Sequence, residues 1–308
     1  MLVHAPLILE CVRASTPDEL RRLHMALRLP LLVRSALAAE RLLCTLQRLH
    51  SLFWGEALWG WYSPKQRETI NHTLAQIVWG ATAGYLPGGS FFEGGLFDWE
   101  WRAISEPPFP RSGRILLGGA GGGRELIQLC RSGFDVVAFE PSERLCEGAR
   151  QAVSPFPGSI VVQASYHDLV TAARERTGPL AAHVLNASFD AVFFGWSSFN
   201  FAFTDMDCRE LLNATRMVAP IAPLLLSFGS ILGAEDGRLD RLRPVIRRVC
   251  KLLGAPADRS RGDEFSLGGF AHFFSLDEFG FAASDSGYRI HHIRPVLESY
   301  YYAILTPQ

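Results

Sequence analysis

From residue 114 onward, short apolar runs alternate with longer segments in which apolar residues recur at helical spacing. Five runs have the length and composition of buried strands: 115–118, 136–139, 159–163, 189–195 and 223–228. Segments between and after them predict helices over 125–130, 142–153, 208–218 and 239–253, the last with Pro244 in its first turns. Parallel strands joined by helices predict an α/β fold with a doubly wound sheet.

The C-terminal pattern differs from the alternation before it. Two apolar runs, 287–293 and 299–305, are joined by a short turn containing Pro295. Because this turn leaves no room for a crossover helix, the two runs pair antiparallel. The sequence therefore predicts a mostly parallel seven-stranded sheet that ends in a C-terminal antiparallel hairpin.

The N-terminal part has the periodicity of helices. A capping box with proline at the first helical position begins at Thr16, and a second one begins at Ser63. Between them, apolar positions recur at close to helical period and predict one long helix: Leu32, Ala36, Ala39, Leu43, Leu46 and Phe53. After Ser63, a third helix carries one stripe that we expect to be buried: Ile70, Leu74, Ile77, Val78 and Ala81. These helices predict a cap or a surface for a homodimer, with a substrate lid as the alternative.

Composition changes between residues 84 and 110, where glycines, aromatic residues and acids mix without a period. Flexible backbone combined with large rings often borders a ligand site. The alternative is a linker whose rings fill the seam between helices and sheet. We expect part of this segment to cover a bound cofactor, and we place a domain boundary between a helical part with its linker, 1–109, and the sheet domain, 110–308.

The glycine cluster after the first predicted strand is the strongest chemical signal. Gly119, Gly121 and Gly123 separate an apolar strand from a helix, so the backbone can approach a ligand closely at a helix N-terminus. Glu140 ends the second strand, twenty-one positions beyond Gly119. An acid at that place can accept hydrogen bonds from a ribose diol, which predicts a cofactor that contains a nucleoside.

Composition excludes several classes of function. The formal net charge is -1, with 30 basic and 31 acidic residues, so no basic surface indicates a nucleic-acid partner. The six cysteines are scattered without a CxxC pair, which is typical of a reducing cytoplasm, and no cluster has the spacing of metal ligands. No apolar run approaches the roughly 18 residues of a membrane span, and residues 1–13 lack the features of an export signal.

Taken together, these motifs resemble the class I S-adenosylmethionine-dependent methyltransferases over roughly residues 110 to 305. The resemblance rests on the glycine turn, on Glu140, on the start of strand four at Phe189-Asp190-Ala191-Val192 and on the closing hairpin. The run Gly118-Gly119-Ala120-Gly121-Gly122-Gly123-Arg124-Glu125 looks like that of a bacterial methyltransferase-like subgroup, as do Phe194–Phe199, Gly262-Asp263 and Ala271–Phe274.

The resemblance implies S-adenosylmethionine as cofactor and S-adenosylhomocysteine as product. In that family the glycine turn faces the methionine and ribose, and the acid after strand two holds the ribose hydroxyls. The positions expected to bind the cofactor are Gly119, Ala120, Gly121, Gly123, Glu125, Glu140, Pro141, Ser165, Tyr166 and Gly195, with Asp168 as an alternative beside the base.

This sequence departs from the family two positions before Gly119. The family usually has an acid there, and this chain has Leu117. The amino group of the cofactor then needs another partner, either a backbone carbonyl of the turn or Glu125.

The loop after strand four is rich in rings and has a few polar groups, as expected of an apolar substrate wall. Its candidate substrate-binding residues are Trp196, Ser198, Phe199 and Asn200; the alternative is that Trp196 and Phe199 fill the core. His272 is the candidate general base, since histidine titrates near neutral pH, and the alternative is a hydrogen-bonded core residue. His167 and Asp263 are weaker candidates.

These observations predict methyl transfer to an oxygen or nitrogen of a small, partly apolar metabolite or peptide. One alternative is a protein that binds S-adenosylmethionine without methylating, such as an isomerase, a cyclase or a regulatory binder. A nicotinamide-dependent oxidoreductase is disfavoured because the turn lacks the longer dinucleotide spacing and because the chain has only two lysines, with no Tyr-x-x-x-Lys pair.

Overall fold

The structure is a computed structural model that describes residues 30–201, 208–231, 242–255, 260, 262–266 and 268–308. The chain divides into two compact units, described separately below. One comprises Met1–Trp61 with Gly233–Arg259, and the other comprises Tyr62–Leu232 with Ser260–Gln308. This division differs from the boundary expected after residue 109, because residues 62–109 group with the sheet.

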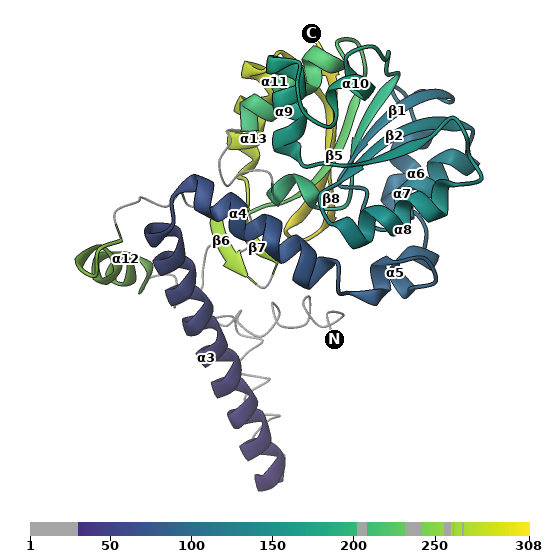
Figure 1. Cartoon of the computed structure of the whole chain (residues 1–308). Coiled ribbons are helices and arrows are strands. Elements are labelled where there is room, and N and C mark those ends of the chain that lie inside the picture. Colours follow the sequence, from purple (N-terminus) through teal and green to yellow (C-terminus); the bar gives the residue numbers. More distant parts are fainter. Residues whose placement is uncertain (1–29, 202–207, 232–241, 256–259, 261, 267) are drawn as a thin grey trace. The chain divides into compact units, whose positions relative to one another are not determined.

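A seven-stranded sheet forms the centre of the larger unit (Figure 1). Its strand order is β3-β2-β1-β4-β5-β9-β8, in which β1 to β5 run parallel and β9 pairs antiparallel with both β5 and β8. The strands are β1 Gly113–Gly118, β2 Phe134–Glu140, β3 Ile160–Gln163, β4 Ala191–Phe194, β5 Leu224–Gly229, β8 Tyr288–Leu297 and β9 Tyr300–Pro307. The structure confirms the predicted doubly wound sheet and its C-terminal hairpin.

Helices cover both faces of this sheet. One buried cluster includes residues of α9, α11 and α13, and a second includes residues of α6, α7 and α8. Adjacent residues of β1 divide between the clusters, Leu116 in the first and Leu117 in the second, because neighbouring strand residues face opposite sides. The helices are α6 Asp98–Ser105, α7 Arg124–Arg131, α8 Glu143–Val153, α9 Tyr166–Glu175, α10 Ala181–Val184, α11 Cys208–Val218 and α13 Leu276–Asp285.

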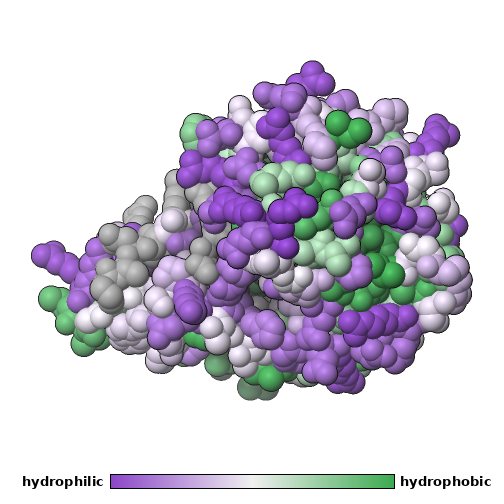
Figure 2. Space-filling view, turned by 45° about the horizontal axis from the view of Figure 1, so that its top comes forward, coloured by the Kyte–Doolittle hydropathy of each residue, from purple (hydrophilic) through white to green (hydrophobic). Residues whose placement is uncertain are grey.

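Polar side chains occupy most of the molecular face drawn in Figure 2. This is expected where helices turn their apolar stripes toward a sheet. Among the helices described, none combines the length and the apolar character that crossing a membrane requires.

The smaller unit contains the predicted long helix, α3 Leu31–Trp61, and α12 Arg243–Leu252. Pro244 lies in the first turn of α12, as expected. Buried Ala57 of α3 clusters with Cys250 and Ala255, and Glu56 pairs with arginines of the segment that includes α12. The helix predicted from Thr16 lies outside the described residues.

The third predicted helix is divided in two. Ser63 caps α4 Pro64–Leu74 through the expected capping box with Gln66, and a π-helical segment, Ala75–Trp79, follows directly. The predicted stripe of buried residues is wrong here: Ile77 is 62% exposed, and Ile70, Leu74 and Val78 are only half-buried. Ile77 and Val78 lie in the π-helical segment, where a turn contains more residues than an α turn and the 3.6-residue period is lost, whereas Ile70 and Leu74 precede it in α4.

Candidate functional site

The glycine turn lies at the carboxyl ends of the central strands. Gly119 and Gly121 both have positive φ, at 67° and 55°, which glycine adopts without strain. Space is open above Gly121, where an added Cβ would meet no atom within 4 Å. The N–H of Gly195 donates to the carbonyl of Gly118 at 2.8 Å and joins the ends of β1 and β4. The turn therefore presents its backbone at the edge where doubly wound sheets bind ligands.

Glu140, the last residue of β2, is tied to this turn. One carboxylate oxygen accepts a hydrogen bond from the N–H of Gly121 and the other from the N–H of Ser142, both at 2.9 Å. Burial raises the pKa of Glu140 to about 7, against the opposing effect of these two hydrogen bonds. Each carboxylate oxygen can accept a further hydrogen bond, so the side chain retains acceptor capacity.

A buried ionic cluster lies beside the turn. Arg124 donates to both oxygens of Glu100 at 2.7 Å and also pairs with Glu125. Glu125 in turn accepts from the N–H of Trp196 at 3.3 Å, and its Oε1 lies 3.4 Å from the position that a Cβ would take on Gly195. The Glu125 carboxylate therefore faces the end of β4.

Two carboxylates face one guanidinium in this cluster. Burial raises the pKa of Glu100 to about 7, although the hydrogen bond from Arg124 opposes the shift. Burial lowers the pKa of Arg124, but Glu125 and Glu100 outweigh that effect and keep it above its ordinary value. The cluster carries a negative charge when both acids are ionised, which favours a cation nearby.

Aromatic rings surround the cluster. Trp196 lies 4.9 Å from Phe97 and 5.9 Å from Phe91, measured between ring centroids, and Tyr85 stacks on Phe91 at 4.9 Å. The Arg124 guanidinium lies 4.2 Å from the centroid of the Phe97 ring. These residues come from the segment between residues 84 and 110 and from the loop after β4, so the rings form a wall beside the turn.

The segment between residues 84 and 110 contacts the glycine turn itself. A Cβ on Gly122 would lie 2.0 Å from the carbonyl oxygen of Tyr85 and 3.1 Å from the Cα of Leu86. Short helices, Ala83–Tyr85 and α5 Ser90–Glu93, form this part of the chain. This segment therefore lies against the glycine turn, and the expectation that part of it covers a cofactor stays a prediction.

Ser165 and Tyr166, which we expect beside the adenine of the cofactor, have different surroundings. Ser165 caps α9 through a capping box with Asp168, whose carboxylate accepts from the Ser165 N–H at 2.7 Å. In this capping box Ser165 is the N-cap residue of α9 and Asp168 is its partner three positions later. The Tyr166 hydroxyl lies 2.6 Å from the Ser198 hydroxyl, which also donates to the carbonyl of Gly195. Tyr166 and Ser198 therefore belong to the edge of the site, and Ser165 serves the helix.

Two of the predicted substrate-binding residues lie in the core, so the substrate-wall prediction is wrong for them. Phe199 is fully buried and lies 5.5 Å from Phe274, between ring centroids. Asn200 is 1% exposed and bridges two strands, since its amide donates to the carbonyl of His272 and accepts from the N–H of Gly229. The loop turns sharply at Ser197, at φ 56°, which directs Phe199 and Asn200 inward and leaves Trp196 and Ser198 half-buried.

His272 does not have the geometry of a general base. It ends β7 Gly269–His272, which pairs with β6 Asp263–Ser266 in a separate two-stranded sheet. Its Nδ1 lies 2.7 Å from Asp263 and its Nε2 lies 3.1 Å from Glu278. Burial lowers the pKa of His272, but the two carboxylates raise it to about 9. The ring is a cation at neutral pH with both nitrogens engaged, so the structure contradicts the predicted base role.

Two of the remaining candidates, Ala120 and Pro141, are held through their backbone groups. Ala120 is buried, and its N–H donates to the carbonyl of Phe139 at 3.1 Å, so its methyl group faces the core. The carbonyl of Pro141 accepts from the side chain of Gln76 at 2.9 Å. His167 is half-exposed and lies 3.9 Å from Glu68. In the described part of the chain, no group of three or more His, Cys, Asp and Glu side chains could hold a metal ion.

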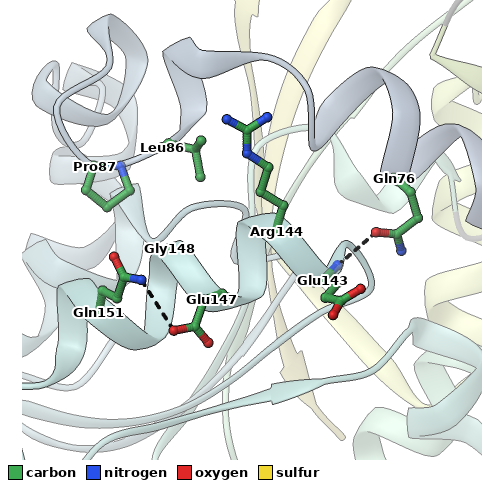
Figure 3. Close-up of a pocket in the computed structure, with 8 residues that line it drawn as sticks. All are labelled: Gln76, Leu86, Pro87, Glu143, Arg144, Glu147, Gly148 and Gln151. Atoms are coloured by element: carbon green, nitrogen blue, oxygen red, sulfur yellow. Dashed lines mark hydrogen bonds between the residues drawn. The ribbon is translucent and has the colours of Figure 1, made fainter.

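A cavity of about 590 Å³ lies along α8 (Figure 3), and its lining residues Leu86 and Gly148 also lie next to Gly122 of the glycine turn. Gln76 forms one end, where its side chain accepts from the N–H of Glu143, and Leu86 and Pro87 form the opposite wall. The lining residues are Gln76, Leu86, Pro87, Glu143, Arg144, Glu147, Gly148 and Gln151. None of the predicted site residues lines this cavity, so we do not place the reaction there.

Several residues of this region escaped the sequence prediction. Arg124 and Glu100 are 24 positions apart, and the local sequence shows only that Glu100 lies between two tryptophans in a segment rich in aromatic and charged residues. The sequence predicts no pairing of His272 with Asp263 or Glu278, although these two carboxylates together raise the pKa of His272.

Comparison with known proteins identifies the fold. No protein-family model matches the chain, and no curated protein matches it. Among solved structures, it is similar to an S-adenosylmethionine-dependent methyltransferase from Leishmania major, at 15% identity and TM-score 0.50, over 80% of this chain and 85% of that one. A methyltransferase of the same cofactor class from Aquifex aeolicus matches at 14% identity and TM-score 0.43, over 80% and 100%. A glycopeptide N-methyltransferase in complex with S-adenosylmethionine matches at 16% identity and TM-score 0.45, over 68% and 93%.

At such low sequence identity, the structural similarity shows the fold and nothing more specific. The larger unit has the Rossmann-like fold of class I methyltransferases, with the strand order described above. The finer resemblance to a bacterial subgroup with this glycine run stays a prediction.

Proposed function

We propose that the chain binds S-adenosylmethionine and transfers its methyl group to an oxygen or nitrogen of a small, partly apolar metabolite or peptide. The observation that carries the proposal is the pairing of Glu140 with the glycine turn, at 2.9 Å from the N–H of Gly121. A fixed acceptor beside an open backbone turn suits a ribose diol.

The ribose end depends on Glu140. Its two oxygens are held by separate backbone N–H groups, so the carboxylate cannot rotate freely. The lone pairs that remain can accept the two ribose hydroxyls. The open space above Gly121 is where this turn admits a ligand that a side chain would exclude.

The methionine end depends on Glu125 in this proposal. Leu117 is fully buried in the core and offers no acceptor there. Glu125 faces the end of β4, and Glu100 with Glu125 gives the cluster one carboxylate more than the guanidinium of Arg124 balances. An ammonium or sulfonium group next to this cluster would restore neutrality, so the donor set fits a cationic cofactor.

The proposed reaction requires little chemistry from the side chains of the protein. When bound, S-adenosylmethionine supplies an activated methyl group on a sulfonium. The protein aligns the acceptor atom and excludes water, and the ring wall formed by Tyr85, Phe91, Phe97 and Trp196 suits both tasks. The same rings favour a substrate with apolar surface.

A second candidate is a protein that binds S-adenosylmethionine without methylating. The engagement of both nitrogens of His272 favours it, because that ring cannot accept a proton from a nucleophile. An assay for S-adenosylhomocysteine release across a panel of amines, phenols and carboxylic acids separates the two candidates, since only a methyltransferase forms that product.

Titration calorimetry tests the cofactor directly. We expect the full chain to bind S-adenosylmethionine and S-adenosylhomocysteine and to leave NAD unbound. Binding of NAD alone would reject the proposal. Glu140→Ala should weaken the binding of both adenosyl ligands by about tenfold or more, as the loss of buried hydrogen bonds implies.

A further inference from the structure

The helix α3 carries a seam with alternating spacings of four and three residues. Its positions are Leu32, Ala36, Ala39, Leu43, Leu46, His50, Phe53, Ala57 and Gly60. This 3.5-residue repeat is the spacing by which helices pair in coiled coils. The whole seam lies in the smaller unit.

The second half of the seam is already paired within the chain. Ala57 is fully buried in a cluster with Cys250 and Ala255. Gly60 approaches Ala255 so closely that an added Cβ would lie 2.6 Å from its side chain. The segment 250–255, at and after the end of α12, therefore packs on the seam from about Phe53 to Gly60.

The leucines in the first half of the seam are exposed. Leu32 is 84% exposed, Leu43 is 60% exposed and Leu46 is 52% exposed, and the neighbouring Leu42 adds a further 59% exposed side chain. Between residues 31 and 50 the seam extends for about 30 Å of helix. Leucines that repeat on one face over this length are typical of a surface that another helix covers.

The order of large and small residues along the seam indicates what covers it. In an antiparallel pair of identical helices centred between positions 39 and 43, Ala39 of one helix lies opposite Leu43 of the other. The next layer outward places position 36, an alanine, opposite Leu46. A parallel pair in register would instead set alanine against alanine and leucine against leucine. Antiparallel pairing fills these two central layers with one large and one small side chain, which suits close packing, and the next layer outward pairs Leu32 with His50.

We propose that the exposed half of α3 is a homodimer interface, in which two copies of this helix pair antiparallel about a two-fold axis between positions 39 and 43. The interface is isologous, since each copy supplies the same residues. Its strength comes from burying the leucines that are now exposed.

Light scattering of the full chain, combined with size-exclusion chromatography, tests the interface. At micromolar concentration the wild-type chain should have the mass of two chains. Leu43→Glu combined with Leu46→Glu should reduce it to the mass of one, because four buried carboxylates would meet in the dimer. The control is Ile221→Glu, an 86% exposed residue of the larger unit, which should leave the dimer intact.

A wild-type chain with the mass of one chain would overturn the proposal, whether another segment or another protein covers α3. A dimer that survives the double substitution would also overturn it. Far-UV circular dichroism of the double variant should match the wild type, because both positions are exposed within one chain.

Disulfide trapping tests the orientation separately. A mixture of the Ala39→Cys chain and the Leu43→Cys chain should give a crosslinked dimer on a non-reducing gel, in larger amount than either chain alone or the wild type. Crosslinking of each variant with itself, without a gain on mixing, would contradict the antiparallel pairing.

Discussion

Glu140 accepts a hydrogen bond at 2.9 Å from the backbone N–H of Gly121, which lies nineteen positions earlier in the chain. The acid at the end of β2 and the turn after β1 therefore form one rigid unit. Burial raises the pKa of this acid to about 7, so its charge changes near neutral pH. This gives the proposed cofactor site a pH dependence that can be measured.

Binding of S-adenosylhomocysteine should strengthen as the pH rises from 6 to 8. A carboxylate accepts hydrogen bonds from ribose hydroxyls better than the protonated acid does, and the ionised fraction of a group with a pKa of about 7 rises about tenfold over this range. We expect the affinity from titration calorimetry to increase by about the same factor.

The Glu140→Gln variant should lack this pH dependence. It should bind S-adenosylhomocysteine over the whole range with the weaker affinity that the wild type has at pH 6. The matched control is Glu147→Gln on the exposed side of α8, which should keep the wild-type profile. A wild-type affinity that is constant from pH 6 to 8 would contradict the role of Glu140.

Glu125→Gln should weaken both adenosyl ligands by about tenfold, because the cluster would lose the charge that favours a cation. Folding should be retained, since Arg124 keeps its two hydrogen bonds with Glu100. Calorimetry on this variant is compared with Glu93→Gln, whose side chain is exposed on α5. If both variants bind the adenosyl ligands with equal affinity, Glu125 does not contact the methionine end of the cofactor.

Asn200→Ala should destabilise the protein by about 3 kcal/mol, measured as the free energy of unfolding in urea. The substitution removes acceptors and donors from the buried backbone of Gly229 and His272. Asn213→Ala, exposed on α11, is the control and should change stability by less than about 0.5 kcal/mol. A stable Asn200→Ala chain would restore the substrate-facing role expected from sequence.

His272→Gln should remove a pH-dependent part of the stability. The folded pKa of about 9 lies above the ordinary value of 6.5, so the stabilisation is complete below pH 6.5 and is lost as the pH rises through 9. This difference between the two pKa values corresponds to about 3 kcal/mol in the free energy of unfolding.

Urea unfolding at pH 6 and pH 9.5 measures this difference. The wild type should be more stable than the variant at pH 6, and the gap should shrink at pH 9.5. If the difference in free energy of unfolding is the same at both pH values, His272 is not protonated between Asp263 and Glu278 in the folded protein.

The sheet could be predicted because its strands are continuous apolar runs separated by helices. Ile115–Leu117, Ala191–Phe194 and Leu224–Leu226 are buried on both faces, so burial alone determines their composition. The hairpin followed from the short connection between its strands, although the turn was placed wrongly: Pro295 lies within β8 and pairs with Tyr301, and the turn is at residues 298–299. These features depend on local sequence and on connection length.

The site could be predicted only in part, because its contacts join distant elements. No local period shows that Phe199 and Asn200 turn inward while Trp196 and Ser198 do not, since a left-handed residue at Ser197 decides the direction. The state of His272 depends on Glu278, which lies on the following helix, and a carboxylate partner is not visible in the pattern around the histidine.

The most direct measurement of the central claim is a crystal structure of the full chain grown with S-adenosylhomocysteine. The account predicts the ribose hydroxyls on the carboxylate of Glu140, with the amino group of the homocysteine end next to Glu125 and the ring wall around the sulfur. Density for the ligand elsewhere, such as the cavity along α8, or contacts that avoid both acids would contradict it.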